Sequence, residues 1–325
     1  MNLALKVDVD TYRGTLEGVP RLLDLFAKEG IRATFFFSLG PDNTGKALRR
    51  VFRKGFVRKV LSASPSASYG LTTMLYGTIL PAPDIGADPA AVRRMREAAA
   101  AGHAAGIHAW DHVDWHDRLP SMSRDAVLRT FGRAAERFAQ VFGERARLAA
   151  APGWTANGIS VEAYEAHGIE VSSDTRGGAP FHPLLPDGTP SKILEIPSTL
   201  PTLDELLALP LPGTGSRAER ACGFLRMKMR EREDGAARGA GARPVADPAG
   251  RLQVHSVHTE IEGGPAFLGA FSRLIGGWRR DGVRFLGFDE LREILTGSGK
   301  WPVKGLTFKM VPGRATPVAS GKEAE

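Results

Sequence analysis

Apolar residues are distributed along this chain in two alternating patterns. Short uninterrupted runs, such as residues 3–7 and 33–39, have the length and composition of buried strands. Between these runs, residues 19–29 repeat apolar side chains at helical spacing. The start of the chain therefore predicts a strand, a helix and a second strand.

The same alternation recurs further along the chain. We expect helices over residues 90–101, 124–142, 160–167 and 266–280, and strands over residues 105–108, 147–151, 170–173, 252–258 and 283–287. Alternation on this scale predicts an α/β fold in which helices cover parallel strands. In such folds the catalytic groups collect where the strands reach their C-terminal ends.

Three segments do not follow the alternation. Residues 45–85 mix basic, apolar and serine residues and are expected to be an insertion. Residues 230–250 are rich in Ala, Gly and Arg and are expected to form a second insertion, a mobile loop. The tail, residues 296–325, has little periodicity and is expected to be peripheral.

Composition restricts the chemistry that is available. Cys222 is the only cysteine, which excludes an internal disulfide and a cysteine-based zinc or iron–sulfur site, so a metal would need His and carboxylate ligands. No stretch approaches the roughly 18 apolar residues of a spanning helix, and the start has no secretory leader pattern. We therefore expect a cytoplasmic protein.

The charge is biased toward cations. The formal net charge is +7, and Lys and Arg cluster in residues 46–59 and in the tail. Such an excess suits nucleic acid, anionic lipid or a phosphate-bearing substrate, and it is also compatible with compositional drift.

Two histidines and two aspartates form the first candidate for chemistry. His108 and His112 are four residues apart, and on one helical turn they would share a face and could share an ion, although surface or core histidines also occur at this spacing. Asp8 and Asp10 lie at a strand end, where alternation directs both to one face and a cation would offset their repulsion. One carboxylate could complete a two-His, one-carboxylate metal site while the other acts as base.

A third histidine supplies a candidate acid. His258 ends the apolar run of residues 252–258. Taken alone, such a residue is more often a structural histidine. Because hydrolysis of an amide requires protonation of the leaving amine, and histidine titrates in the useful range, His258 is a candidate for this step.

These motifs, in this order, resemble the polysaccharide deacetylases, also called the NodB-homology fold or carbohydrate esterase family 4. The resemblance implies a distorted, incomplete (β/α) barrel over residues 1–295. It also implies that Asp10, His108 and His112 hold a divalent zinc, cobalt, manganese or nickel ion and that Asp8 is the base. His258, oriented by Asp174, would be the acid, and the substrate would meet Gly153, Trp154, Arg176 and Arg13.

One departure from the family pattern concerns the base. The arginine that usually precedes the proline of the third motif is absent from Ala150-Ala151-Pro152, and Arg176 is a candidate replacement.

Within the family, residues 7–19, 36–43, 108–112, 173–177 and 258–263 most resemble the members that act on a lipid-linked amino sugar in lipid A modification and polymyxin resistance. This resemblance implies removal of an N-formyl group from 4-deoxy-4-formamido-L-arabinose on undecaprenyl phosphate. The expected partner is then an anionic membrane rather than nucleic acid, with the protein peripheral at the inner face of the inner membrane.

Three alternatives remain open at this point. One is an N-deacetylase of another glycan, and another is a non-enzymatic membrane-surface protein that uses residues 46–59. The third is a phosphoryl-transfer enzyme of the haloacid-dehalogenase kind, which also begins with a strand ending in Asp-x-Asp but has no use for the two histidines.

Overall fold

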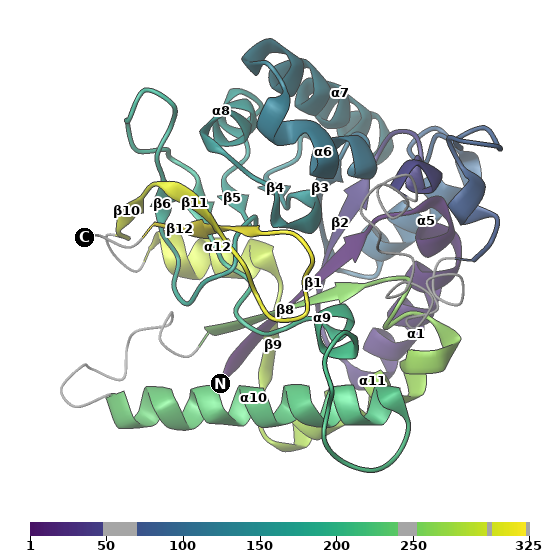
Figure 1. The fold of residues 1–325 in the computed structure, drawn as a ribbon, viewed down its shortest axis with the longest axis vertical. Coiled ribbons are helices and arrows are strands. Elements are labelled where there is room, and N and C mark those ends of the chain that lie inside the picture. The colour runs from purple at the N-terminus through teal and green to yellow at the C-terminus, as the bar shows by residue number, and fades with distance from the viewer. Residues whose placement is uncertain (48–69, 240–251, 298–300, 323–325) are drawn as a thin grey trace.

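The computed structural model describes residues 1–47, 70–239, 252–297 and 301–322. Its central strands are β1 (Asn2–Val9), β2 (Thr34–Ser38), β3 (Ala104–Ala109), β4 (Leu148–Ala149), β5 (Val171–Ser172), β7 (Leu194–Glu195), β8 (Leu252–His258) and β9 (Arg284–Leu286). They pair in parallel in the order β7-β5-β4-β3-β2-β1-β8, and the sheet curls into an open half-barrel (Figure 1). This is the distorted, incomplete (β/α) barrel that the resemblance implies.

Strand β1 is the centre of the sheet. It pairs with β8 along its whole length, with β9 at Asn2–Ala4 and with β2 at Lys6–Val9. A strand with neighbours on both sides and both faces covered needs a nearly continuous apolar run. All residues of β1 except the first are buried, which agrees with that expectation.

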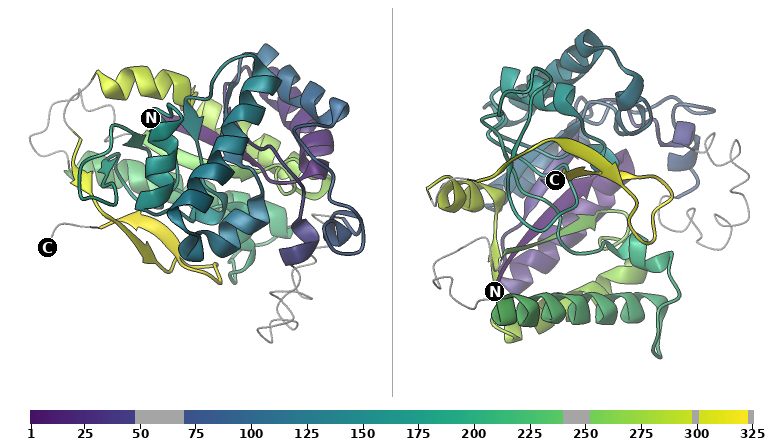
Figure 2. Two further views of the ribbon diagram at one scale, coloured as in Figure 1. Left: turned by 90° about the horizontal axis from the view of Figure 1, so that it is seen from above. Right: turned by 60° about the vertical axis from the view of Figure 1, so that its left-hand side comes forward.

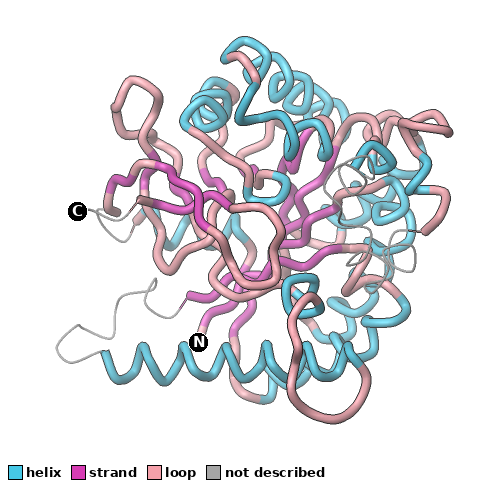
Figure 3. Tube along the Cα trace, viewed as in Figure 1, coloured by secondary structure: helices cyan, strands magenta, loops and turns pink. Residues whose placement is uncertain are grey.

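The helices lie around the outer side of the curled sheet (Figures 1 and 3). Their bounds are α1 (Val19–Glu29), α5 (Pro89–Ala100), α6 (His112–Arg118), α7 (Arg124–Phe142), α8 (Gly158–Ala166), α9 (Leu203–Leu207), α10 (Arg217–Gly239), α11 (Pro265–Arg280) and α12 (Phe288–Thr296). Helix α7 packs on α8, and α10 packs on α11. None of the helices in the described ranges is long and apolar enough to span a membrane.

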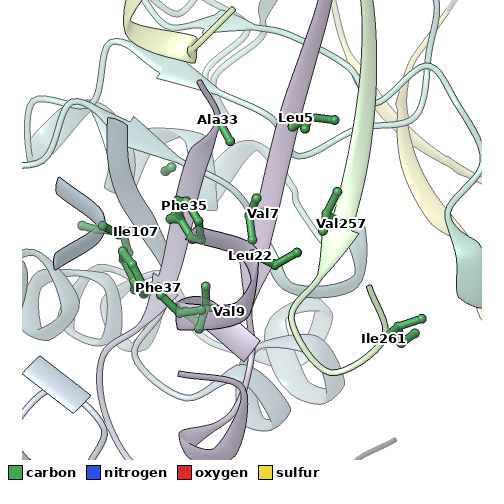
Figure 4. Packing of buried hydrophobic residues seen from close by; sticks show 14 of the residues in the cluster. Leu5, Val7, Val9, Leu22, Ala33, Phe35, Phe37, Ile107, Val257 and Ile261 are labelled. Atoms are coloured by element: carbon green, nitrogen blue, oxygen red, sulfur yellow. The ribbon is translucent and has the colours of Figure 1, made fainter. Parts of the chain in front are cut away.

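The main core lies between the sheet and these helices. Val7, Val9, Phe35 and Phe37 project from adjacent strands toward Leu22 of α1 (Figure 4). Burial of each such side chain contributes roughly 1.5–3 kcal/mol. Because side chains alternate along a strand, residues 6 and 8 of β1 project to the opposite face, the interior of the half-barrel.

The tail packs more closely than the sequence predicts. Strand β10 (Val303–Lys304) pairs with β6 (His182–Pro183), and β11 (Leu306–Lys309) forms a hairpin with β12 (Val318–Gly321). Val318 and Ala319 are fully buried, and the Ala319 carbonyl accepts the Arg176 N–H. The hairpin, in yellow, crosses the half-barrel (Figure 2). A peripheral tail is therefore the wrong description for these residues.

The two expected insertions are only partly described. Residues 230–239 continue helix α10 and are not a loop, because their Ala, Arg and Glu residues favour a helix. Residues 48–69 and 240–250, which include most of the basic segment, lie outside the described residues. Residues 70–85 begin after that gap and return to the segment that follows β2, where the Asp42 N–H donates to the Pro83 carbonyl.

Candidate metal centre and active site

Three side chains with metal-binding atoms converge at the C-terminal ends of β1 and β3. One ligand atom each from Asp10, His108 and His112 lie within 4.8 Å of one another. His108 Nε2 is 3.1 Å from Asp10 Oδ1, and His112 Nε2 is 3.6 Å from Asp10 Oδ2. The structure therefore brings together the three residues that the sequence predicts as metal ligands.

His108 and His112 lie close together, but not on one helical turn as the sequence predicts. His108 belongs to β3, whereas His112 is the first residue of α6, so the two do not share a helical turn. The turn between them is held by Asp111, which caps α6 by accepting the Asp114 N–H and also accepts a hydrogen bond from Asn43 Nδ2. The two rings are 5.3 Å apart between centroids.

The environment of these side chains fits a divalent cation. His108 Nδ1 lies 2.7 Å from the Ala150 carbonyl and donates to it, so that the other ring nitrogen, Nε2, faces Asp10. Asp10 Oδ1 is buried and makes no hydrogen bond. Burial opposes ionisation of Asp10, but the imidazoles of His112 and His108 outweigh it and lower the pKa of Asp10 well below its usual range. Two imidazole nitrogens and a carboxylate are a ligand set for a transition metal with open positions.

Asp8 is paired with a buried lysine. Lys6 Nζ donates to Asp8 Oδ2 at 2.6 Å, and both side chains are almost fully buried. Arg176, the cation that the sequence predicts beside Asp8, instead pairs with Glu205 at 3.2 Å. The other oxygen, Asp8 Oδ1, is buried without a hydrogen-bond partner. Asp8 therefore has one oxygen held and one available.

His258 lies beside Asp8 in the adjoining strand, since the two are register partners of β8 and β1. Its Nδ1 is 3.5 Å from Asp204 Oδ1. Burial alone would lower the pKa of His258, but the carboxylates of Asp204, Asp10 and Asp8 raise it to about 9. His258 is therefore protonated at neutral pH.

The carboxylate beside His258 is Asp204, not Asp174. Asp174 Oδ1 accepts the Ala151 N–H at 2.6 Å, and burial followed by the nearby Glu195 raises the pKa of Asp174 well above its usual range. Asp174 thus holds the segment before Gly153. Sequence reasoning missed Asp204 because it is far from His258 along the chain. The only signal was the helix-start pattern Thr202-Leu-Asp-Glu205.

Gly153 and Trp154 form an unusual turn beside the site. Both have positive φ, 59° and 54°, which is uncommon for a non-glycine residue. A Cβ on Gly153 would lie 2.1 Å from His116 Cδ2, so glycine is required there. Strained backbone of this kind occurs often at functional sites.

Trp154 is buried and surrounded by cations. Its ring centroid is 5.0 Å from Lys6 Nζ, with the guanidinium carbons of Arg176 at 5.0 Å and Arg314 at 4.8 Å. The ring also packs edge-on against His258. Only 1% of Trp154 is exposed, so it supports Lys6 and His258 and presents little surface to a substrate. The tail contributes Arg314 to this cluster.

Arg13, the remaining predicted substrate contact, pairs with Glu17. Its Nε donates to Glu17 Oε1 at 3.2 Å, and about a third of its side chain is exposed. A Cβ on Gly70 would lie 2.5 Å from Arg13, so the described end of the first insertion reaches this side chain.

The fold and this arrangement of carboxylates and histidines define a class of protein. The model of the polysaccharide deacetylase family matches residues 4–172, and the chain belongs to this family. The family predicted from the sequence motifs is therefore confirmed. A haloacid-dehalogenase reading, which leaves the histidines without a role, is not supported.

The chain is also similar in sequence to two named proteins of other organisms. The chain is 32% identical over 261 residues to a protein of Shewanella sediminis named as a probable 4-deoxy-4-formamido-L-arabinose-phosphoundecaprenol deformylase, ArnD, covering 80% of this chain and 76% of that protein. It is also 32% identical over 195 residues to a protein of the same name from Wigglesworthia glossinidia brevipalpis, covering 60% and 67%.

Solved structures share the fold. The Puue allantoinase superposes with a TM-score of 0.59 at 17% identity, covering 92% of this chain and 91% of the other. A probable polysaccharide deacetylase from Pseudomonas aeruginosa PAO1 superposes with a TM-score of 0.56 at 16% identity, covering 90% of each chain. At these identities the similarity extends to the fold alone.

Proposed function

We propose that this protein removes the formyl group from 4-deoxy-4-formamido-L-arabinose carried on undecaprenyl phosphate. The reaction consumes one water and yields formate and the free amine. The observation that carries the proposal is that Asp8 and His258, partners on the neighbouring strands β1 and β8, lie together beside the Asp10, His108 and His112 cluster. The choice of formyl group and lipid carrier is supported by the names of the two relatives.

Asp10, His108 and His112 would hold the metal ion. A divalent zinc, cobalt, manganese or nickel ion suits these ligands and supplies Lewis acidity for the formyl oxygen and for a water molecule. The donated Nδ1 proton of His108 fixes the ring so that Nε2 remains a ligand.

Asp8 acts as the general base in this proposal. Its free oxygen, Oδ1, takes a proton from the attacking water while Oδ2 stays bound to Lys6. The lysine ammonium compensates a carboxylate that would otherwise be a lone buried charge. The oxygen of that water then forms the new bond to the formyl carbon.

The backbone N–H of Gly153 is proposed to meet the negative charge that develops on the formyl oxygen. Its turn is fixed by the required glycine and by Trp154, so the donor would need no rearrangement during the reaction.

His258 acts as the general acid. It delivers its proton to the sugar nitrogen as the C–N bond breaks, which lets the amine leave. Its pKa of about 9 keeps the proton available at neutral pH, and the Asp204 carboxylate lies 3.5 Å from its Nδ1. Trp154 and Arg176 support this geometry from behind the site.

The proposal is tested by mass analysis of the purified enzyme with the formamido-arabinose phospholipid. Release of formate and a product lighter by one formyl group support it. Release of acetate from the matching N-acetyl substrate, with no turnover of the formamide, would instead indicate an N-deacetylase.

We further propose that the protein works at the cytoplasmic face of the inner membrane, bound peripherally to anionic lipid. Leu71 and Ile79, in the described part of the first insertion, are 74% and 77% exposed. Exposed large apolar side chains near a basic segment favour an interfacial contact.

A further inference from the structure

A cavity of about 340 Å³ lies between the C-terminal tail and the segments that follow β5 and β7. Its lining includes Arg176, Arg232, Lys304, Lys309, Phe181 and Val311. Four of the lining residues are cationic, and none carries a carboxylate. The ligands of the proposed metal site do not line this cavity.

Three of the four cations have no counter-charge within the described residues. Arg176 is paired with Glu205, whose Oε1 accepts a hydrogen bond from Nη1 and whose Oε2 lies 3.2 Å from Nη2. For Arg232, Lys304 and Lys309, no ion pair with a described carboxylate occurs. The side chain of Lys304 is half-buried, and those of Arg232 and Lys309 are exposed to solvent.

The cavity draws these cations from three separate elements. Arg232 comes from α10, Lys304 from β10 and Lys309 from β11. Gly321 of β12 makes room for one of them, because a Cβ there would lie 2.9 Å from Lys304 Cδ. Like charges gathered by independent elements repel one another, and a bound anion would offset this repulsion.

We propose that this cavity binds a phosphate group, at a site separate from the metal cluster. A phosphate carries up to two negative charges and several acceptor oxygens, which suits a guanidinium and two ammonium groups. The volume is at the small end of ligand pockets, and Phe181 and Val311 provide an apolar wall for a short carbon portion.

The phosphate could belong to a soluble phosphate ester or to a lipid head group. In both cases the phosphate would be separated from the active site by Arg176 and Ser198. Arg176 and Ser198 form a shared wall, because both line the cavity and both also contact Trp154.

The test is calorimetric titration of the metal-loaded protein with inorganic phosphate at low ionic strength. The wild type is compared with Lys304→Gln/Lys309→Gln and with a control, Lys28→Gln/Lys192→Gln, which removes two exposed lysines elsewhere. We expect the dissociation constant to rise at least about tenfold in the cavity variant and to stay within about twofold of wild type in the control.

A second variant, Arg232→Gln, tests the same cavity. It alters α10 rather than the tail, so weaker phosphate binding in this variant cannot be attributed to a displaced hairpin. Thermal melting followed by circular dichroism verifies that each variant is folded. Equal phosphate affinity in the wild type and the cavity variants, or no binding at millimolar phosphate, would overturn the proposal.

Vesicles of phosphatidylcholine with phosphatidic acid separate the two sources of phosphate. If the cavity variant also sediments less with these vesicles, the site accepts a lipid head group. If it loses soluble phosphate but keeps vesicle binding, the ligand is a soluble phosphate ester. Formate release does not enter this test, so its result is independent of the proposed deformylation.

Discussion

Lys6 and Asp8 project from the same face of β1, and the lysine ammonium donates to the carboxylate at 2.6 Å inside the half-barrel. The alternation of a strand makes this pairing unavoidable once both residues face the interior. In the proposed mechanism, this pair would compensate for the missing arginine of the third family motif, because a cation from β1 lies beside the proposed base.

Replacing Lys6 with Met should lower kcat by about 10²-fold or more, because the proposed base loses the charge that compensates it. Lys6→Arg should retain much of the activity, since it preserves the cation. Steady-state kinetics with matched metal loading provides the measurement. If Lys6→Met turned over at the wild-type rate, the pair would have no part in catalysis.

Asp204→Asn should shift the alkaline limb of the pH–rate profile toward lower pH. The proposed acid, His258, has its pKa raised to about 9, and activity falls as its proton is lost above that pH. A cation bound to Asp10 would offset the effect of that carboxylate on the pKa of His258. The raised pKa therefore depends mainly on Asp204. An unchanged alkaline limb in Asp204→Asn would contradict this assignment.

The raised pKa of His258 also affects the free energy of unfolding. Because the folded pKa of His258 lies above its ordinary value of 6.5, its ion pairs stabilise the fold fully below about pH 6.5. This contribution disappears as the pH rises through about 9. Asp204→Asn should therefore destabilise the protein more at pH 6 than at pH 10, as measured by chemical unfolding at both values.

Much of the fold follows from pattern alone. The run of residues 252–258 coincides with β8, and the helices α1, α7 and α11 lie close to their predicted bounds. Strands β4 to β7 contain two residues each, too few to establish an alternation. The loop prediction for residues 230–250 is wrong for residues 230–239, the end of α10, because their glycines obscure a composition that favours a helix.

The cluster of Asp10, His108 and His112 could be predicted because these residues stand in recognisable motifs at the ends of apolar runs. Asp204 could not be, because only folding brings it to His258, and the same holds for Arg314 beside Trp154. Lys6 did leave a signal. A lysine inside an otherwise apolar strand is costly to bury unless it is paired, and Asp8 is its neighbour on that face.

Leu71→Ser/Ile79→Ser should bind anionic vesicles more weakly while still deformylating a short, water-soluble analogue. Both side chains are largely exposed, so their replacement should not disturb the core. Met310→Ser, at an exposed apolar position in the tail, is the matched control. Vesicle co-sedimentation decides the question, and equal binding of all three proteins would exclude this contact.

The central claim is that Asp10 holds the metal while Asp8 moves the proton. It is tested most directly by measuring metal content and formate release in the same preparations of wild type, Asp8→Asn and Asp10→Asn. We predict that Asp8→Asn keeps its metal and loses about 10²-fold or more in rate, whereas Asp10→Asn loses both metal and activity. Equal loss of metal in the two variants, or full formate release by metal-free wild type, would contradict the account.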